Sequence, residues 1–514
     1  MNSTITSSQP LQLDGDRLTL DDFARVVVSG KTVSLSPQAV ANMRRSRNQV
    51  ENLVQREQTV YGVTTGFGKF SDTFIDTSQS SELQQNLIRS HACGVGKPLS
   101  EETVRGMMLL RANALAKGYS GVRPSTVELL IELLNRKIHP VVPSQGSLGA
   151  SGDLAPLAHM TLPLLGEGEV FLHGKRIPAR EALNQFGLEP VDLQAKEGLA
   201  LINGTQMMAS LSALALLRGK RLLLCADMIA AMTMEALNGI PHAYHSLLHQ
   251  ARGQQGQTVT ASNLRRLLKN SGRTSLPGEK RVQDAYSLRC VPQVHGASKD
   301  AYRYVLDIVT RELNAATDNP LLFPVEGEVI SGGNFHGQPL ALAADFLTIA
   351  LAEIANISER RTERLVNPQL SGLPAFLTRQ GGLNSGYMIM QYTAASLVSE
   401  NKTLCHPASV DSIPSSANQE DHVSMGSISA RKLHSVISNT ERVLAVEYLC
   451  AAQGLEFGQG PMGSGTSEAY SMLRKEVPSL TRDREGQADI ERAVGLIRKS
   501  SMVENISTKL GLEY

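Results

Sequence analysis

Residues Pro339–Leu365 read PLALAADFLTIALAEIANISERRTERL, and this stretch decides the predicted fold class. Its apolar residues recur every three or four positions, as they do along one face of an amphipathic α-helix. Four further stretches are similarly rich in Leu, Ala, Met and Glu at helical spacing: Leu222–Leu237, Ala297–Ala316, Gly386–Leu404 and Ile428–Leu455. Because strand signals are few and short, we predict a mainly α fold built around a long-helix bundle.

The N-terminal part of the chain has a different character. It mixes helical segments with turn-rich runs at Tyr61–Gly68 and Gly146–Gly152, where special backbone geometry is expected. We therefore predict two domains. The first is a mixed N-terminal domain at residues 1–205, and the second is a long-helix bundle with a C-terminal helical region at residues 206–514.

Three shorter segments have patterns of their own. Val170–Ile177, with a turn at Gly174, and Leu322–Ile330 are predicted to form small hairpins. Ala251–Arg281 is polar and basic and contains glycine, so we predict a solvated loop or insertion there. We favour this over a phosphate-binding patch because the few aromatic residues leave no stacking surface.

Charge and cysteine content restrict the class of protein. The chain has 50 Lys and Arg against 49 Asp and Glu, so no global field favours nucleic acid or an anionic membrane, and a small neutral ligand fits better. Its five cysteines are odd in number and form no CxxC pair, which suits a reducing cytosol. The polar start, Met1–Pro10, has no signal-peptide pattern, and we expect a cytoplasmic protein.

One uncharged stretch, Gly198–Leu217, approaches the length that spans a bilayer. It contains polar residues, among them Asn203 and Gln206, that would need hydrogen-bond partners in lipid. The buried middle of a helix bundle supplies such partners, so we predict no membrane span.

Small residues are concentrated at Gly146–Pro156, which reads GSLGASGDLAP. Small side chains let a backbone fold tightly on itself. If the amide nitrogen of Gly152 reaches the carbonyl carbon of Ala150, ring closure and loss of two waters become possible, and Ser151 becomes an exocyclic alkene. The same residues also fit a glycine-rich loop that caps a helix. The tripeptide by itself leaves both interpretations open.

Three histidines raise the question of a metal site. His242, His245 and His249 fall at spacings that could place them on one helix face. No HExxH pattern or carboxylate ligand lies nearby, so we interpret them as packed or solvated side chains and predict no metal.

Four motifs together carry a family resemblance: Tyr61–Gly68, Gly146–His159, Asn203–Gln206 and Asn314–Pro320. In this order, and over nearly the whole chain, they resemble the aromatic amino-acid ammonia-lyase family. The resemblance implies a helical fold of the ammonia-lyase/fumarase-like type and a 4-methylidene-imidazol-5-one ring formed from Ala150-Ser151-Gly152. It also implies that no dissociable cofactor is needed. The ring-forming loop lies in the predicted N-terminal domain.

Such a ring suits a difficult elimination. The β-proton of an amino acid is a very weak acid and the amine is a poor leaving group, and an electrophile that bonds to the substrate eases both problems. The resemblance implies that Tyr61 is the general base, which requires a lowered pKa, and that Tyr286 assists proton transfer. It implies substrate-binding roles for five further residues: Asn203, Gln283, Arg289, Phe335 and His91. Among them, Arg289 would hold the substrate carboxylate through paired hydrogen bonds.

Two positions favour a substrate. The pair Ser90-His91 resembles that of histidine-specific family members, whereas relatives acting on phenylalanine or tyrosine show Phe-Leu or His-Leu. Glu420 is a carboxylate that could pair with an imidazole, and a site built for a polar ring rejects an apolar one. We therefore expect L-histidine as the substrate and trans-urocanate and ammonia as the products.

Three alternatives are weighed against this expectation. A phenylalanine or tyrosine ammonia-lyase, or an aminomutase that returns ammonia to the β-carbon, is opposed by His91 and Glu420. An inactive helical scaffold is opposed by the presence of the tripeptide together with Tyr61, Tyr286 and Arg289. The resemblance further implies a homotetramer in which each pocket is assembled from three subunits.

Overall fold

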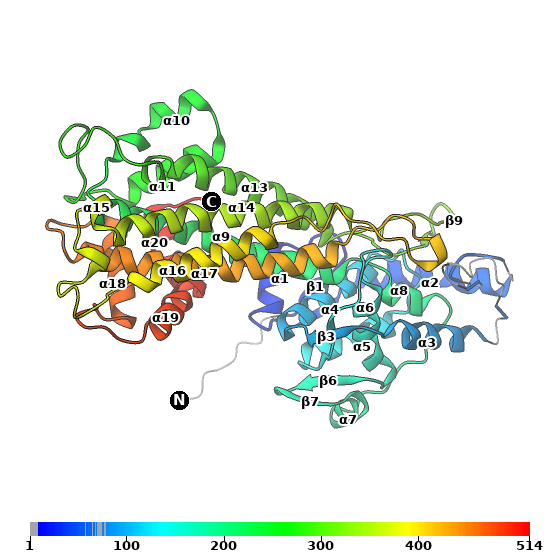
Figure 1. Cartoon of the computed structure of the whole chain (residues 1–514). Coiled ribbons are helices and arrows are strands. Elements are labelled where there is room, and N and C mark those ends of the chain that lie inside the picture. Colours follow the sequence, from blue (N-terminus) through cyan, green and yellow to red (C-terminus); the bar gives the residue numbers. More distant parts are fainter. Residues whose placement is uncertain (1–8, 57, 64, 67, 69–74, 77–78) are drawn as a thin grey trace. The chain divides into compact units, whose positions relative to one another are not determined.

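The computed structural model describes residues 9–56, 58–63, 65–66, 68, 75–76 and 79–514, and Met1–Ser8 of the polar start lie outside them. The chain divides into two compact units (Figure 1). Unit 1 comprises Met1–Leu214, Asp307–Ala344 and Pro407–Arg431, and unit 2 comprises Ala215–Leu306, Asp345–His406 and Lys432–Tyr514. This differs from the expected sequential split at residue 205, because two later segments of the chain return to unit 1.

Unit 1 contains short helices and small sheets. Its helices are α1 (Leu20–Val27), α2 (Pro37–Gln55), α3 (Ser80–His91), α4 (Glu101–Ala116), α5 (Pro124–Asn135), α6 (Leu154–Thr161), η3 (Leu162–Leu165), α7 (Ala179–Gln185), α8 (Glu197–Ile202) and η6 (Ser416–Asn418). Its strands are β1 (Leu11–Leu13), β2 (Val33–Leu35), β3 (Val95–Pro98), β4 (His139–Pro140), β5 (Pro143–Gln145), β6 (Glu169–Leu172), β7 (Lys175–Pro178), β8 (Leu321–Phe323) and β9 (Glu328–Ile330).

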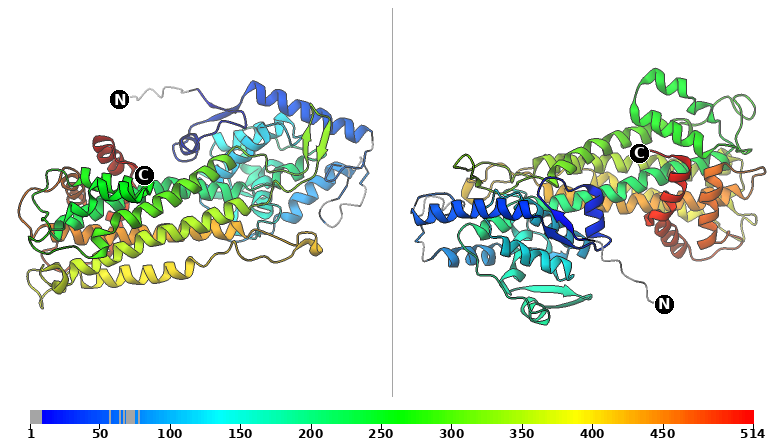
Figure 2. Two further views of the ribbon diagram at one scale, coloured as in Figure 1. Left: turned by 90° about the horizontal axis from the view of Figure 1, so that it is seen from above. Right: turned by 180° about the vertical axis from the view of Figure 1, so that it is seen from behind.

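The strands pair in four small sheets, with β1 parallel to β2 and the pairs β3–β5, β4–β6, β6–β7 and β8–β9 antiparallel. The two predicted hairpins are confirmed as β6–β7 and β8–β9. Gly174 has φ +75° in the first of them, a left-handed conformation that favours glycine. This hairpin and α7 lie side by side in unit 1 (Figure 2).

Helix α4 is the central helix of unit 1. It begins after Ser100, whose side chain accepts a hydrogen bond from the backbone N–H of Thr103, and it carries Glu101 and Glu102 in its first turn. Both features stabilise a helix N-terminus. All residues from Thr103 to Ala116 are buried, as expected of a helix that is enclosed on every side.

The five predicted long helices are confirmed, and the fold is mainly α. They are α9 (Gln206–Ala236), α13 (Val291–Glu312), α14 (Gln338–Val366), α16 (Met388–Leu404) and α17 (Gly426–Leu455). The remaining helices belong to unit 2: η4 (Pro241–Tyr244), α10 (Ser246–Arg252), α11 (Gln255–Leu267), α12 (Tyr286–Arg289), α15 (Pro368–Ser371), η5 (Ala375–Leu377), α18 (Ser464–Glu476), α19 (Gly486–Arg498) and α20 (Ser500–Leu510).

The prediction of a solvated loop at Ala251–Arg281 is wrong over its first half. That half forms the end of α10 and the whole of α11. Helix α11 buries Ala261, Leu264 and Leu267, which recur at helical spacing, while its other faces carry polar residues. The polar composition concealed a narrow apolar stripe that becomes buried by packing.

Charged groups are buried within unit 2. Asp227 accepts hydrogen bonds from Lys299 at 2.5 Å and Asn263 at 2.8 Å and lies 2.8 Å from His295. Arg361 pairs with both carboxylate oxygens of Glu447, at 2.6 and 2.8 Å. Such pairs remove the cost of leaving a charge alone in the interior.

Helix α14 is the one helix in the described part of the chain that is long and apolar enough to cross a membrane. The share of its most apolar window that is buried within the structure is 72%. This degree of burial is typical of the core helix of a folded domain. The stretch Gly198–Leu217, in contrast, is interrupted between α8 and α9 by Asn203–Thr205.

Candidate active site

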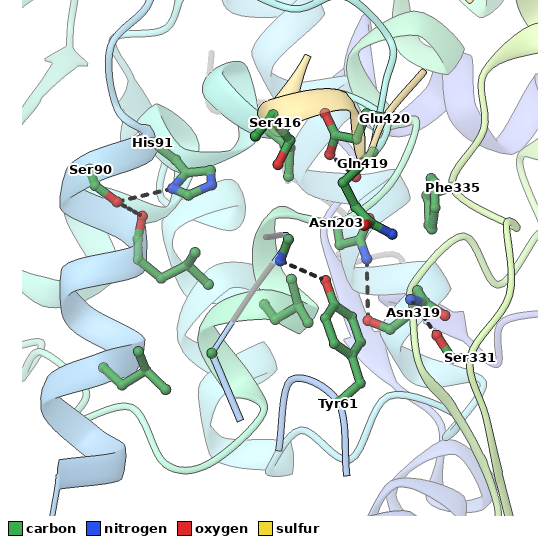
Figure 3. A pocket seen from close by; sticks show the side chains of 18 of the residues that line it. Tyr61, Ser90, His91, Asn203, Asn319, Ser331, Phe335, Ser416, Gln419 and Glu420 are labelled. Carbon is green, nitrogen blue, oxygen red and sulfur yellow. Dashed lines mark hydrogen bonds between the residues drawn. The ribbon is translucent and has the colours of Figure 1, made fainter. Parts of the chain in front are cut away.

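A cavity of about 1140 Å³ lies within unit 1 (Figure 3). Its polar and aromatic lining residues come from segments far apart in the sequence: Tyr61, Asn86, Ser90, His91, Ser151, Asn203, Asn319, Ser331, Phe335, Ser416, Gln419 and Glu420. The cavity thus collects Tyr61, His91, Ser151, Asn203, Phe335 and Glu420, six of the residues singled out from the sequence. Ala150 and Gly152 flank Ser151.

The tripeptide is held in a tight turn. Gly149 and Gly152 have φ of +69° and +73°, in the left-handed region that glycine adopts readily. Gly152 forms a parallel bridge with Gly204, and a Cβ added to Gly152 would overlap with the Gly204 carbonyl group. The backbone N–H of Asp153 donates to that carbonyl at 2.7 Å. No residue other than glycine fits at position 152 without a shift of the backbone.

The loop on the N-terminal side of the tripeptide is fixed by a second segment. The Ser427 hydroxyl donates to the Ser147 carbonyl at 2.6 Å, and the Ser424 hydroxyl donates to the Gly149 carbonyl at 3.1 Å. The backbone N–H of Met425 donates to the Leu148 carbonyl at 2.8 Å. Residues 424–427 therefore donate hydrogen bonds to the carbonyl groups of three consecutive residues, Ser147, Leu148 and Gly149.

Asp153 connects the tripeptide to the first turn of α9. Its Oδ2 accepts hydrogen bonds from the backbone N–H groups of Met207 at 2.9 Å and Met208 at 3.0 Å. These N–H groups have no partner within their own helix, and a carboxylate satisfies them well. Burial raises the pKa of Asp153 to about 7, although these hydrogen bonds oppose the shift. Asp153 was not among the site residues predicted from the sequence, although its position directly after the tripeptide indicates a role there.

Glu420 lies over the tripeptide. Its Oε1 accepts a hydrogen bond from the Ser151 hydroxyl at 3.0 Å, and its Oε2 accepts one from the Ser415 hydroxyl at 2.7 Å. Between Ser415 and Glu420, the residues Ser416, Ala417 and Asn418 have φ of +51°, +53° and +68°. A left-handed conformation costs about 1–2 kcal/mol per non-glycine residue, so this turn is held by its surroundings.

Tyr61 places its phenol in the cavity. Its oxygen accepts a hydrogen bond from the backbone N–H of Gly68 at 3.3 Å. Burial raises the pKa of Tyr61, and the carboxylates of Glu420 and Asp318 act in the same direction. This direction is opposite to the one that a general base requires, so the groups of this chain do not by themselves favour the tyrosinate.

His91 is a neutral hydrogen-bonding group. Burial lowers its pKa. The Ser90 hydroxyl donates to the Leu87 carbonyl at 3.1 Å, so its oxygen is free to accept from Nδ1 of His91, which lies 3.1 Å away. We assign the proton to Nδ1 on this basis, which leaves a lone pair on Nε2.

Asn203 offers a free acceptor to the cavity. Its Nδ2 donates to the Asn319 carbonyl at 3.2 Å, whereas its buried Oδ1 has no hydrogen-bond partner among the described residues. Asn319 in turn accepts from the backbone N–H of Gly332 at 2.7 Å and donates to the Ser331 hydroxyl at 3.2 Å. These bonds fix the start of the loop that carries Phe335.

Gln283, Tyr286 and Arg289 do not line this cavity. They belong to unit 2, where the side chain of Tyr286 is 69% exposed and the Arg289 guanidinium lies 4.5 Å from the centre of the Tyr286 ring. The described residues that line the cavity include neither Lys nor Arg. A substrate carboxylate therefore finds no cationic partner among them.

The three histidines considered as metal ligands do not form one helix face. His242 lies in η4, His245 precedes α10, and His249 is buried with Nδ1 2.9 Å from Gln257 Nε2. No group of three His, Cys, Asp or Glu side chains with metal-binding geometry occurs among the residues described by the structure.

Comparisons with known proteins identify the family of the chain. The family model described as aromatic amino acid lyase matches residues 18–475. The histidine ammonia-lyase of Natranaerobius thermophilus is 56% identical over 98% of this chain and 99% of its own length. The histidine ammonia-lyase of a Geobacillus species is 58% identical over 93% of this chain and 94% of its own length.

Solved structures of related enzymes share the fold. The histidine ammonia-lyase from Trypanosoma cruzi superimposes with a TM-score of 0.91 at 44% identity, covering 98% of this chain and 96% of that one. The tyrosine aminomutase from Streptomyces globisporus gives a TM-score of 0.93 at 39% identity, covering 98% and 99%. The same fold therefore carries more than one substrate preference and more than one outcome of the reaction.

Proposed function

The chain belongs to the aromatic amino acid lyase family and is an ammonia-lyase, and we propose that its substrate is L-histidine and its organic product trans-urocanate. One observation carries this proposal. The cavity that contains Ser151 also contains His91 and Glu420, a neutral imidazole and a carboxylate. These are hydrogen-bonding partners for a polar ring, and a phenyl side chain would leave them unpaired.

We further propose that Ala150-Ser151-Gly152 cyclises to 4-methylidene-imidazol-5-one. Three features of the turn fit this group: the left-handed Gly152, the close approach of Gly204, and the exposure of Ser151 to the cavity. Once formed, the ring supplies an electrophilic carbon that activates the amine as a leaving group. The residues of the chain then have to bind the amino acid, orient it and remove its β-proton.

The proposed roles follow the positions of polar atoms. Oδ1 of Asn203 accepts a hydrogen bond from the substrate amine, because it lines the cavity, is buried and has no partner among the described residues. Nε2 of His91 and the carboxylate of Glu420 are both acceptors, so together they bind the substrate ring as an imidazolium, which has an N–H at each end. Phe335 packs beside the ring, and Tyr61 is positioned to take the β-proton.

The carboxylate partner is proposed to come from a second copy of the chain. The cavity lacks Lys and Arg among its described residues, while Arg289 lies on a segment of unit 2 that exposes apolar side chains. Leu276 is 72% exposed and Val282 is 79% exposed on this segment, and apolar exposure of this kind marks interaction surfaces. We therefore propose a homotetramer in which Gln283, Tyr286 and Arg289 complete the pocket of a neighbouring subunit.

A cationic Arg289 brought into the cavity also addresses the pKa of Tyr61. A positive charge within a few ångström favours the tyrosinate and opposes the effect of burial. Tyr61 would thus be able to act as the base only in the assembled tetramer. Size-exclusion chromatography with light scattering, combined with an activity assay, tests the proposed assembly, because an active monomer would contradict it.

The substrate is tested directly with purified protein and no added cofactor. L-Histidine, L-phenylalanine and L-tyrosine are offered separately, the conjugated acid is followed by ultraviolet absorbance, and Ser151→Ala is the control. We expect urocanate from histidine, little product from the other two, and near-total loss of activity in the control. Dominant cinnamate or coumarate, or a β-amino acid detected by chromatography, would overturn the substrate assignment.

A further inference from the structure

A buried arginine lies directly behind the turn that supports the tripeptide. Arg111, in the enclosed helix α4, is 0% exposed. Its Nη1 donates to the Asn203 carbonyl and to Oε1 of Gln206, both at 2.9 Å, and its Nη2 donates to the Ala200 carbonyl. One guanidinium thus holds the end of α8, the Asn203-Gly204-Thr205 turn and the start of α9.

Arg111, Gly204 and Gly152 form three successive layers. A Cβ added to Gly204 would overlap with Nη1 of Arg111, and a Cβ added to Gly152 would overlap with the Gly204 carbonyl. Gly204 is therefore in contact with the guanidinium on one side and with the tripeptide on the other. Displacement of the guanidinium would release the support on which Gly152 rests.

We propose that Arg111 is a positioning residue for ring closure, because its guanidinium holds the Asn203-Gly204 turn against Gly152. This inference rests on the proposed cyclisation of Ala150-Ser151-Gly152. It assigns to a residue outside the cavity a role in making the electrophile.

The chemistry explains why such support is needed. The Gly152 nitrogen bonds to the Ala150 carbonyl carbon, and that carbonyl oxygen leaves as water with the hydrogens of the Gly152 and Ser151 nitrogens. A second water takes the hydroxyl of Ser151 and the hydrogen on its Cα, and the Cα–Cβ double bond remains. An amide nitrogen is a weak nucleophile, so closure depends on enforced approach, and a misplacement of about 1 Å can cost about 100-fold in rate.

Further hydrogen bonds connect the start of α9 to Thr317 and its neighbours, beside Arg111. Nε2 of Gln206 donates to the Thr317 hydroxyl at 2.9 Å, and Asp318 accepts from the backbone N–H of Asn319 at 2.7 Å. The ammonium of buried Lys196 donates to Asp318 at 2.5 Å. A Cβ at Gly204 would meet the Thr317 hydroxyl as well as Nη1 of Arg111, so both groups pack against the same side of the turn.

The charge of Arg111 persists at neutral pH. Burial lowers its pKa to about 10, with Asp318 opposing the shift, and none of its three acceptors is a carboxylate. Lysine offers a single nitrogen in place of the planar fork, so it cannot reach all three acceptors in the same geometry. Arg111→Lys is therefore a conservative test of the fork, and Arg111→Met removes the donors altogether.

Helix α4 also supplies a matched control. Arg105 is 7% exposed and donates to the carbonyls of Val27 at 3.0 Å and Val26 at 2.5 Å. It does not line the cavity and has no contact with the Asn203-Gly204 turn. Arg105→Lys therefore weakens a similar set of buried hydrogen bonds on the same helix without touching the support of the tripeptide.

Intact-protein mass spectrometry measures the ring directly, because a cyclised chain is lighter by two waters than the encoded sequence. We expect the wild type and Arg105→Lys to have lost both waters, Arg111→Met to retain them in most molecules, and Arg111→Lys to be intermediate. Circular dichroism melting identifies folded material. In folded Arg111→Met, kcat is expected to fall about 100-fold while KM changes much less, because binding groups of the cavity remain.

The outcomes separate the two proposals. If the wild type loses both waters and both Arg111 variants do so equally, with unchanged kcat, the role of Arg111 is refuted and the proposed function stands. If neither Arg111 variant folds while Arg105→Lys does, Arg111 is a general structural residue and the inference is also refuted. A wild type that keeps both waters overturns the proposed electrophile and this inference with it.

Discussion

Glu420→Gln tests whether the carboxylate above the tripeptide recognises the substrate ring. Glu420 is the one carboxylate among the described residues that line the cavity. Glutamine keeps its size and can still accept from the Ser151 hydroxyl, while the Ser415 hydroxyl can rotate to accept from the new amide group. The substitution therefore removes a charge with little change of shape.

The expected loss follows from the kind of hydrogen bond that disappears. A hydrogen bond to a charged group contributes about 1.5–3 kcal/mol, and 1.36 kcal/mol corresponds to a factor of ten in rate. We expect kcat/KM for L-histidine to fall about 10- to 150-fold. Phenylalanine makes no such bond, so kcat/KM for any residual activity on it is expected to change little.

Initial rates with both amino acids, followed by ultraviolet absorbance, provide the comparison. Intact mass establishes that the variant still loses two waters, and Ser415→Ala serves as the control, since it removes a donor to the carboxylate but keeps the charge. The control is expected to lose less than tenfold for L-histidine. An equal loss for both substrates in Glu420→Gln, with the ring formed, would refute the reasoning.

Three further predictions concern single positions. Gly152→Ala is expected to lower the melting temperature more than Gly174→Ala. Both glycines have a left-handed φ, but a Cβ at position 152 would overlap with the Gly204 carbonyl, whereas a Cβ at position 174 would meet nothing within 4 Å. Equal shifts of the melting temperature in calorimetry would contradict the contact between Gly152 and Gly204. The pKa of Asp153 in the folded protein is about 7, raised from 3.8, so ionisation of Asp153 lowers the unfolding free energy progressively as pH rises from about 4 to 7. Asp153→Asn is expected to make the unfolding free energy depend less on pH over this range. Urea titrations that give the same pH dependence for both proteins would disprove this. His91→Leu replaces a neutral hydrogen-bonding ring with an apolar group, so kcat/KM for L-histidine is expected to fall at least tenfold relative to that for L-phenylalanine, and an unchanged ratio in parallel rate measurements would exclude the assigned role.

Much of the fold was predictable because the residues that a helix buries recur at a regular spacing along its own sequence. The long helices α14 and α17 bury residues three and four positions apart, and this spacing is visible in the sequence without knowledge of any partner. Helix α11 was missed because most of its surface is polar and its buried stripe is narrow. The return of Asp307–Ala344 and Pro407–Arg431 to unit 1 was not visible either, because composition does not encode which distant segment a helix end will meet.

The sequence by itself determined the chemistry-bearing residue types: Ser151 between two small neighbours, the pair Ser90-His91, and Glu420. The tertiary structure decided their surroundings. It placed Glu420 on Ser151, capped α9 with Asp153, raised rather than lowered the pKa of Tyr61, and layered Gly152, Gly204 and Arg111. The reason is physical: residue types are local properties of the chain, whereas burial, electrostatic environment and contact between segments that are distant in the sequence arise when the chain folds.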